Sequence, residues 1–354
     1  MLNFTVGPVQ MNEEILQIGA EQIPYFRTPE FSTVMKENEQ LMKKFTFAEE
    51  KARVIYLTSS GTGAMEAAVI NVFTKQDKVL IVNGGGFGKR FVDLCQIHEI
   101  PYTEINLKTG QTLTKEILEE YGQETYTGFL VNMCETSTGV LYDLELIGDF
   151  CKKKSLMLVV DAISAFMAEP IYMQKYGIDV LLTGSQKALA LPPGIAVMVL
   201  GQRAIEKIEN SKVKSLYFNL KMALKDGERG QTPFTPAVSI LLQMNKRLRM
   251  IEKVGIDEEI RKIQEQALDF RNKIRGLPLK IATETPASSV TALMPTVGNS
   301  AYDIYTTLKE KYNIWVCPNG GALAEQIFRV GHLGALTHED NTTLVCALKE
   351  ILNS

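Results

Sequence analysis

Short apolar runs rich in β-branched residues alternate with amphipathic stretches between residues 50 and 200. Five of these runs have the length and composition of buried strands: RVIYLTSS, KVLIVNG, GFLVNM, LMLVVDA and DVLLTGS. The stretches between them carry the apolar spacing of helices. Strands that alternate with helices form βαβ units, in which the strands run parallel and the helices cover both faces of the sheet. The sequence therefore predicts an α/β fold with a doubly wound, mostly parallel sheet.

Each of the five predicted strands ends in small or polar residues. In a doubly wound sheet, ligands bind in the crevice outside the carboxyl ends of the strands. We therefore expect the segments at these strand ends to converge on one site: 59–62, 83–88, 135–138, Asp161 and 183–187.

The pattern becomes strongly helical after residue 238. Apolar residues recur every three or four positions from 239 to 277, and this spacing is broken only near Gly255. We expect a long helix here that links two domains. Beyond it, SSVTALMP, a helical stretch at 301–312, NIWVCPN and IFRVGHLG predict a smaller α/β domain. The predicted division is a large domain of residues 12–240 and a small domain of residues 241–354, which includes the N-terminal segment 1–11.

The composition is that of a globular protein large enough for two domains, with 354 residues, 45% hydrophobic and 22% charged. No apolar run is long enough to span a bilayer, and the first residues lack the features of a signal peptide, so we expect a cytoplasmic protein. The 38 basic and 41 acidic residues nearly balance, and nothing therefore favours nucleic acid or a membrane surface as a partner. We expect a small-molecule ligand.

The cysteine and histidine content argues against a metal centre. Five cysteines are scattered without a CxxC pair, and the three histidines do not have metal-binding spacing. We expect reduced cysteines, no disulfide framework and no metal ion.

Two residues at predicted strand ends carry the most specific chemistry. Asp161 follows the apolar run LMLVV, where a carboxylate is costly unless it meets a cation or a strong donor; alone, it would more often be a helix cap or part of an ion pair. Lys187 ends the next strand segment and precedes ALALPPGIAVMVL, which would desolvate its amine and make it a nucleophile towards aldehydes. Such a pair fits opposite ends of one pyridine ring, with the carboxylate at the ring nitrogen and the amine on the aldehyde carbon of pyridoxal phosphate (PLP).

Two glycine-rich segments follow other predicted strands. TSSGTGAMEAAVI has the form of a strand end, a turn and a helix start, which can bind phosphate but also occurs as an ordinary capped turn. NGGGFGKR matches neither GxxxxGK[ST] nor GxGxxG, which argues against a nucleotide-binding module. It does present Phe87, an aromatic ring that either lies against a flat ligand or belongs to the core.

Seven motifs occur in the order and spacing seen in one enzyme family: SSGTGAMEA, NGGGFGKR, CETSTG, VVDAISAF, GSQKALALPPG, TPFTPAV and FRVGHLG. By these motifs, which span nearly the whole chain, the sequence resembles the class V aminotransferases, in the branch with alanine/serine–glyoxylate and 2-aminoethylphosphonate–pyruvate transaminases. The resemblance implies a fold-type I PLP-dependent transferase with a large and a smaller α/β domain. It also implies a homodimer with shared active sites, and a small amino acid and a 2-oxo acid as substrates.

The resemblance assigns roles to individual residues. Lys187 matches the Schiff-base lysine that also moves the proton, and Asp161 matches the partner of the pyridine nitrogen. The other cofactor contacts would be Ser60, Gly61 and Thr62 at the phosphate, Phe87 on the ring, Thr136 at the ring hydroxyl, Gln186 beside the lysine, and Thr235, which would reach the phosphate in the other subunit. The substrate contacts would be Arg329, whose planar fork suits a carboxylate, together with Gly7 and Pro8, and with Arg27 nearby.

The same resemblance implies a ping-pong cycle, in which the donor leaves as a keto acid before a second keto acid takes up the nitrogen. Two substrate interpretations stay open: an alanine- or serine-type donor with glyoxylate or pyruvate, or 2-aminoethylphosphonate with pyruvate. A cysteine desulfurase and an inactive binding protein are further alternatives, although Phe87 replaces the stacking histidine usual in desulfurases. Related transaminases often have a histidine two residues before the motif glutamate, where this chain has Met133, so their substrate specificity does not transfer directly.

Overall fold

The computed structural model describes residues 1–353 of the chain, and its centre is a sheet of seven strands. In spatial order these strands are β2 (Arg53–Thr58), β10 (Ile195–Leu200), β9 (Val180–Gly184), β8 (Met157–Asp161), β5 (Gly128–Asn132), β3 (Val79–Asn83) and β4 (Tyr102–Asn106). Strand β10 is antiparallel to both of its neighbours, and the other pairings in the sheet are parallel. The predicted mostly parallel α/β sheet is confirmed, and β4 and β10 are two strands that the sequence analysis did not identify.

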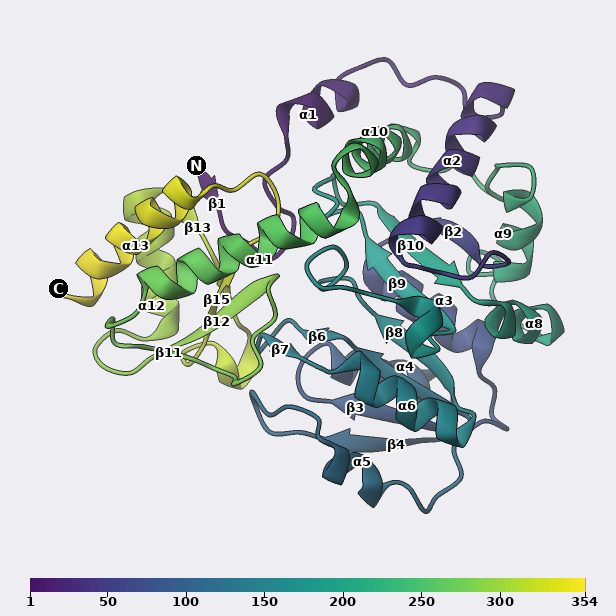
Figure 1. The fold of residues 1–354 in the computed structure, drawn as a ribbon, viewed down its shortest axis with the longest axis horizontal. Coiled ribbons are helices and arrows are strands. Elements are labelled where there is room, and N and C mark those ends of the chain that lie inside the picture. The colour runs from purple at the N-terminus through teal and green to yellow at the C-terminus, as the bar shows by residue number, and fades with distance from the viewer. Residues whose placement is uncertain (354) are drawn as a thin grey trace.

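The central sheet is buried on both faces. Successive side chains of a strand point to opposite faces, and in β2 Val54 and Tyr56 join one hydrophobic cluster while Ile55 and Leu57 join another. The first cluster is covered by α2 (Pro29–Phe45), α6 (Leu144–Lys154) and α10 (Val238–Val254). The second is covered by α3 (Gly61–Val72), α4 (Gly88–Ile97), α8 (Gln202–Asn210) and α9 (Leu220–Gly227). Figure 1 shows these helices around the central sheet.

A second sheet of four strands lies beside the first and is coloured green to yellow in Figure 1. Its order is β11 (Leu279–Ile281), β12 (Val290–Pro295), β15 (Phe328–Gly331) and β14 (Cys317–Pro318). It has its own hydrophobic cluster with α12 (Ala301–Tyr312) and α13 (His338–Leu352). The N-terminal strand β1 (Leu2–Asn3) pairs in parallel with β13 (Ile314–Trp315), and Phe4 is buried in the same cluster. The first residues of the chain therefore pack with the last hundred.

The helical segment predicted at 239–277 is two helices, α10 and α11 (Ile256–Lys273), which meet at Gly255. Gly255 has φ of 94°, a conformation that side chains other than glycine rarely adopt. The α10 side chains Leu241, Met244 and Leu248 are buried in the cluster of the central sheet. The domain boundary at residue 240 stays a prediction, and this packing favours Gly255 as the dividing point.

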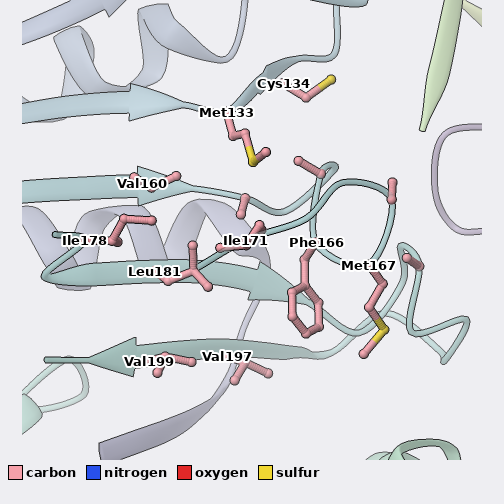
Figure 2. Close-up of a cluster of buried hydrophobic side chains, with 14 of the residues drawn as sticks. Met133, Cys134, Val160, Phe166, Met167, Ile171, Ile178, Leu181, Val197 and Val199 are labelled. Carbon is pink, nitrogen blue, oxygen red and sulfur yellow. The ribbon is translucent and has the colours of Figure 1, made fainter. Parts of the chain in front are cut away.

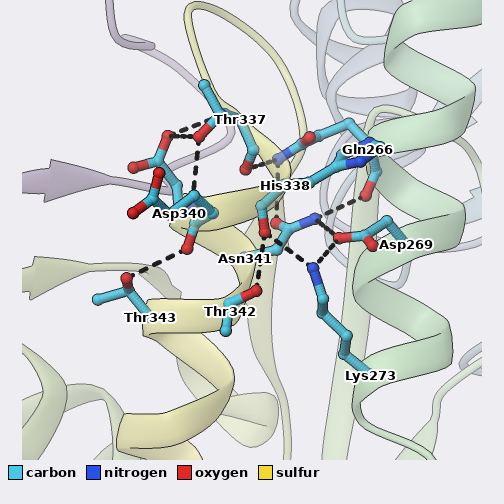
Figure 3. A network of polar contacts seen from close by, with 10 residues as sticks. Gln266, Asp269, Lys273, Thr337, His338, Asp340, Asn341, Thr342 and Thr343 are labelled. Atoms are coloured by element: carbon cyan, nitrogen blue, oxygen red, sulfur yellow. Dashed lines mark hydrogen bonds and ion pairs between the residues drawn. The ribbon is translucent and has the colours of Figure 1, made fainter.

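Helices α11 and α13 are joined by a buried polar network (Figure 3). Asn341, fully buried at the start of α13, donates to the Gln266 carbonyl (3.0 Å) and to Asp269 (2.8 Å). The Gln266 side chain donates in turn to the Asn341 side chain (3.0 Å) and to the Thr337 carbonyl (2.9 Å). Both polar groups of Asn341 are therefore satisfied, as a buried amide requires.

The remaining elements are short: α1 (Glu13–Gly19), α5 (Lys115–Glu120), α7 (Met173–Tyr176), a 3₁₀ turn at Gly321–Leu323, and the hairpin of β6 (Cys134–Glu135) with β7 (Val140–Leu141). Within residues 1–353, no helix has the length and apolarity needed to cross a bilayer. No group of three or more His, Cys, Asp or Glu residues in the same part of the chain could hold a metal ion.

Candidate active site

A pocket of about 230 Å³ opens at the carboxyl ends of the central strands. It is lined by Gly7, Ser60, Gly61, Thr62, Met65, Phe87, Arg90, Cys134, Thr136, Asp161, Ile163, Ser164, Gln186 and Lys187. All five polar segments that the sequence placed at strand ends contribute to it or flank it. Nine of the predicted site residues line it, whereas Pro8, Arg329 and Thr235 lie outside the lining.

Lys187 lies in the turn after β9 and is buried, with 8% of its surface exposed. Ser185 fixes this turn, because its hydroxyl donates to the Pro192 carbonyl (2.7 Å) and accepts from the Ile195 N–H (3.2 Å). The lysine Nζ donates to the Val6 carbonyl at 2.5 Å. Burial lowers the pKa of Lys187 from 10.5 to about 8. An amine with this pKa is partly neutral near pH 8 and can act as a nucleophile or a base.

Gly7 gives the lysine its space. Its φ is 129°, and a Cβ built on it would lie 2.7 Å from Lys187 Cδ and 3.0 Å from the Gln186 carbonyl oxygen. The next residue, Pro8, is exposed, and its carbonyl accepts from the Asn3 side chain at 3.1 Å. The N-terminal segment thus enters the pocket through Val6 and Gly7, while Pro8 turns away from it.

Asp161 ends β8, next to β9, so the predicted adjacency of the two strand ends is present. Only 5% of its surface is exposed, and its carboxylate accepts from the Ile163 N–H at 2.8 Å. Burial raises the pKa of Asp161 from 3.8 to about 6, and the Lys187 charge opposes that rise in part. A carboxylate in this position gains free energy when a cation or an N–H donor lies opposite it.

The turn at residues 60–62 leads directly into α3. Ser60 is the N-cap of the helix, and its side chain makes no capping hydrogen bond within residues 1–353. The first N–H groups of a helix have no partner inside the helix, and with the helix dipole they favour an anion. Gly61 lies so close to Ile163 that a Cβ would be 2.2 Å from its Cδ1. The Thr62 hydroxyl accepts from Arg90 Nη1 at 2.9 Å.

Thr136 and Gln186 complete the predicted pocket wall. The Thr136 hydroxyl is 2.7 Å from the Ser164 hydroxyl, and both side chains are buried. Gln186, the neighbour of Lys187, is partly buried and lines the pocket from the turn after β9.

Phe87 lines the pocket from the start of α4, and the Arg90 guanidinium lies 4.5 Å from its ring centroid. Its backbone N–H donates to the carboxylate of Glu135, a residue with no exposed surface. The sequence analysis expected residues 135–138 near the site but assigned a role only to Thr136. Glu135 and Arg90 are therefore residues that it missed, although both lie inside the motifs CETSTG and NGGGFGKR.

Arg329 lies on β15 and does not belong to the lining of the pocket. Its Nη1 donates to the Thr136 carbonyl (3.3 Å) and its Nη2 to the Pro318 carbonyl (2.6 Å). Its Nε is buried and has no hydrogen-bond partner among residues 1–353. Burial lowers the pKa of Arg329, and the arginine charge in turn lowers the pKa of Lys187. The guanidinium is thus close to the lysine and has an unused donor.

Two further positions lie apart from the pocket. Thr235 is exposed and lines a separate surface hollow with Tyr217 and Phe234, so the predicted contact with the other subunit stays a prediction. Met133 has its side chain in the hydrophobic core with Val160 and the neighbouring strands (Figure 2). Its neighbour Cys134 is the residue of this pair that lines the pocket. The difference at position 133 therefore lies in the core of the protein.

The residues present fit PLP. The buried Asp161 carboxylate accepts from one N–H donor at 2.8 Å and faces a pocket in which a protonated ring nitrogen would relieve its desolvation. The helix start at Ser60 offers N–H groups for a phosphate, Phe87 offers an aromatic face, and Lys187 is a desolvated amine. These four features match the charge, shape and aldehyde of the cofactor.

Comparisons with known proteins give the family. The model of the class V aminotransferases matches residues 25–334. A Helicobacter pylori protein named an uncharacterised aminotransferase is 32% identical over 358 aligned positions, covering 100% of this chain and 94% of its own. The L-aspartate–glyoxylate aminotransferase of Paracoccus denitrificans is 28% identical over 94% of this chain and 86% of its own. The crystal structure of an alanine–glyoxylate aminotransferase from Nostoc is 25% identical, has a TM-score of 0.93 and covers 99% of this chain and 95% of that chain. The chain therefore belongs to the class V aminotransferase family and is a PLP-dependent transaminase of fold type I.

Proposed function

We propose that this transaminase moves an amino group from a small amino acid of the alanine or serine type to glyoxylate or pyruvate, by a ping-pong cycle. The observation that carries the proposal is the buried pair of Lys187 and Asp161 at adjacent strand ends, with one arginine, Arg329, close to the lysine. In this arrangement Lys187 would serve as the base, and Arg329 would bind the carboxylate of the substrate.

Four parts of the pocket would hold PLP. Lys187 Nζ would take the aldehyde carbon, Asp161 would face the ring nitrogen, the turn at 60–62 would take the phosphate, and Phe87 would lie against the ring. When bound, PLP supplies an electron sink for the electron pair left on the substrate Cα after its proton departs.

Lys187 would move that proton. With a pKa of about 8, its amine is close enough to neutrality to accept the proton from Cα, and the resulting ammonium can return it to the neighbouring carbon. The Val6 carbonyl, 2.5 Å from Nζ, accepts a hydrogen bond from the amine and keeps it inside the pocket. Asp161 would stabilise positive charge across the pocket, because its desolvated carboxylate accepts only the Ile163 N–H among residues 1–353.

Arg329 would bind the substrate carboxylate. Its unpartnered Nε and its planar fork suit a bidentate carboxylate contact. Among the described residues that line the pocket, Lys187 and Arg90 carry the positive charges, and Arg27 is engaged with Gln231 and the Thr232 carbonyl. A donor with a single acidic group therefore fits this chain better than a dicarboxylate donor.

The acceptor is supported by the relatives. The Paracoccus and Nostoc proteins have different donors in their names, aspartate and alanine, but share glyoxylate. The second candidate, 2-aminoethylphosphonate with pyruvate, is favoured by the same single arginine, since a phosphonate also forms bidentate contacts with a guanidinium. Alanine and 2-aminoethylphosphonate differ in where the anion lies relative to the reacting carbon, so they compete directly in an assay.

A spectral titration tests this proposal. The absorbance of the bound cofactor should bleach when alanine or serine is added and return with glyoxylate or pyruvate, one half-reaction at a time. Bleaching by 2-aminoethylphosphonate but not by alanine or serine would select the second candidate. No bleaching with any of these donors would contradict both.

We further propose a homodimer. The expected role of Thr235 at the other subunit is supported by its position, which is exposed and separate from the pocket of its own chain. Tyr217, which lines the same hollow, is 45% exposed, and its neighbour in the chain, Leu216, is 71% exposed. An exposed apolar surface beside Thr235 suits a partner subunit.

A further inference from the structure

The glycine-rich segment NGGGFGKR, which matches neither nucleotide-binding template, lies against the Glu135 carboxylate. A Cβ on Gly85 would lie 2.7 Å from Glu135 Cδ and 2.4 Å from Ser137 Oγ. Only a residue without a side chain leaves room for a carboxylate at this distance. Gly85 therefore allows the segment that carries Phe87 to close over Glu135.

Glu135 has donors on several sides. It accepts from the backbone N–H groups of Phe87 (3.2 Å) and Gly88 (2.9 Å) and from the Asn132 side chain (3.0 Å). It also accepts from the Ser137 N–H (3.2 Å) and from the Ser137 hydroxyl (2.5 Å). A buried carboxylate is tolerated when donors of this number surround it.

The carboxylate replaces a missing helix cap. Phe87 is the N-cap of α4, and its own side chain cannot cap the helix. Glu135, from a distant part of the chain, accepts from the N–H groups at this helix start, where a negative charge is favoured by the helix dipole. The backbone of Phe87 is thereby held while its ring stays free to face the pocket.

We propose that Glu135 is a positioning residue, which fixes the backbone of Phe87 so that the aromatic ring forms a rigid platform for the cofactor. Glu135 itself lies outside the pocket lining, so it would act on the cofactor only through Phe87. The inference rests on the proposed stacking role of Phe87, but it is independent of which amino donor the enzyme uses.

The test compares Glu135→Gln with Glu169→Gln. Glu169 is also buried, with 6% of its surface exposed, and accepts a backbone N–H at 2.6 Å from Ser288, outside the pocket lining. The readouts are the PLP dissociation constant, the visible circular dichroism of the bound cofactor, and the unfolding midpoint of the apoprotein. We expect Glu135→Gln to weaken PLP binding roughly tenfold and to reduce the dichroism, because a charged acceptor of two N–H groups is lost, while Glu169→Gln leaves both within twofold.

A double-mutant cycle with Phe87→Ala separates positioning from a general effect on the fold. If Glu135 acts through the ring, Glu135→Gln should change PLP affinity by less than twofold in the Phe87→Ala background. An undiminished effect in that background, or equal effects of Glu135→Gln and Glu169→Gln, would overturn the proposal. If Glu135→Gln does not fold, Gly85→Ala presses on the same carboxylate from the other side, and normal PLP affinity and dichroism in that folded variant would overturn it equally.

Titrations of the wild-type enzyme with amino donors distinguish a failure of the proposed function from a failure of the proposed positioning role of Glu135. A wild-type enzyme that binds PLP but is bleached by none of the proposed donors would contradict the proposed function alone. Loss of PLP binding confined to Glu135→Gln would still support the positioning role.

Discussion

Single residues in this enzyme are constrained by the atoms that surround them at van der Waals distance. Gly7 is the clearest case, because it combines φ of 129° with a position against the Lys187 side chain. Gly7 itself lines the pocket, and the adjacent Val6 carbonyl accepts from Nζ. Any side chain at this position must move either the lysine or the N-terminal segment.

Gly7→Ala should therefore impair cofactor binding. The new Cβ would lie 2.7 Å from Lys187 Cδ, and the backbone would be strained as well. We expect kcat/KM to fall at least roughly tenfold, the equivalent of about 1.4 kcal/mol, with a weaker PLP affinity. Gly320→Ala is the control, because a Cβ there meets no atom within 4 Å in the described part of the chain. Wild-type kinetics for Gly7→Ala would show that the lysine does not need this space.

Asp161 should make the stability of the apoprotein depend on pH. Its pKa is about 6 in the folded state and 3.8 when unperturbed, so between these values the folded state holds a proton that the unfolded state has lost. Stability therefore falls as the pH rises from about 4 through 6, by on the order of 3 kcal/mol from this residue. Urea unfolding of wild type and Asp161→Asn across this pH range isolates the contribution of Asp161 to stability. Parallel pH profiles of the two proteins would contradict this contribution.

The strand-end positions of Lys187 and Asp161 could be predicted from sequence, because a polar residue after a buried strand has a defined place in a doubly wound sheet. The role of Glu135 could not. Its contacts with Phe87 join residues 48 positions apart, and only the folded chain shows which N–H groups it meets. Arg329 was predicted by resemblance, and the structure adds that it lies outside the pocket lining, with a buried Nε that has no hydrogen-bond partner among residues 1–353.

At the scale of elements, the place of β10 in the sheet could not be predicted from the local sequence pattern. The run IAVMVL was interpreted as the apolar surrounding of Lys187, and it is also an inner strand between β2 and β9. Its direction follows from the connection, since residues 185–194 are too few for the crossover that a parallel return requires. By contrast, Gly255 was visible in sequence as a break in the helical spacing, and it separates α10 from α11.

The α11–α13 contact should depend on Asn341. Asn341→Ala removes the hydrogen bonds of this side chain with the Gln266 side chain, the Gln266 carbonyl and Asp269, which costs about 1–3 kcal/mol in the free energy of unfolding. Asn353→Ala, at the exposed end of the same helix, should change it by less than about 0.5 kcal/mol. Denaturant unfolding compares the two variants, and equal effects would mean that the network in Figure 3 contributes little.

At the scale of the whole molecule, the active site joins parts that are far apart in sequence. The Lys187 amine donates to the Val6 carbonyl, and the Val6 N–H donates to Cys317 Sγ at 3.3 Å. The central sheet, the N-terminal segment and the second sheet thus meet at one residue, Val6. The fold class followed from the alternation of strands and helices, but this meeting point depends on the pairing of β1 with β13, two residues long on each side, which no periodicity reveals.

The oligomeric state belongs to the same scale. A homodimer of the 39.5 kDa chain would have twice that mass, 79 kDa. Sedimentation velocity at micromolar concentration should give this species for the PLP-bound enzyme. A single species of 39.5 kDa with full transaminase activity would contradict shared active sites and the proposed role of Thr235.

The account as a whole depends on Lys187 as the residue that holds the cofactor. Borohydride reduction of the PLP-bound enzyme fixes the cofactor to whichever amine holds it, and peptide mass spectrometry then identifies the lysine. We predict the pyridoxyl label on the peptide that contains Lys187, and no label in Lys187→Ala. Label on a different lysine of the wild-type enzyme, or an unlabelled Lys187 peptide in an enzyme that turns over, would contradict the account.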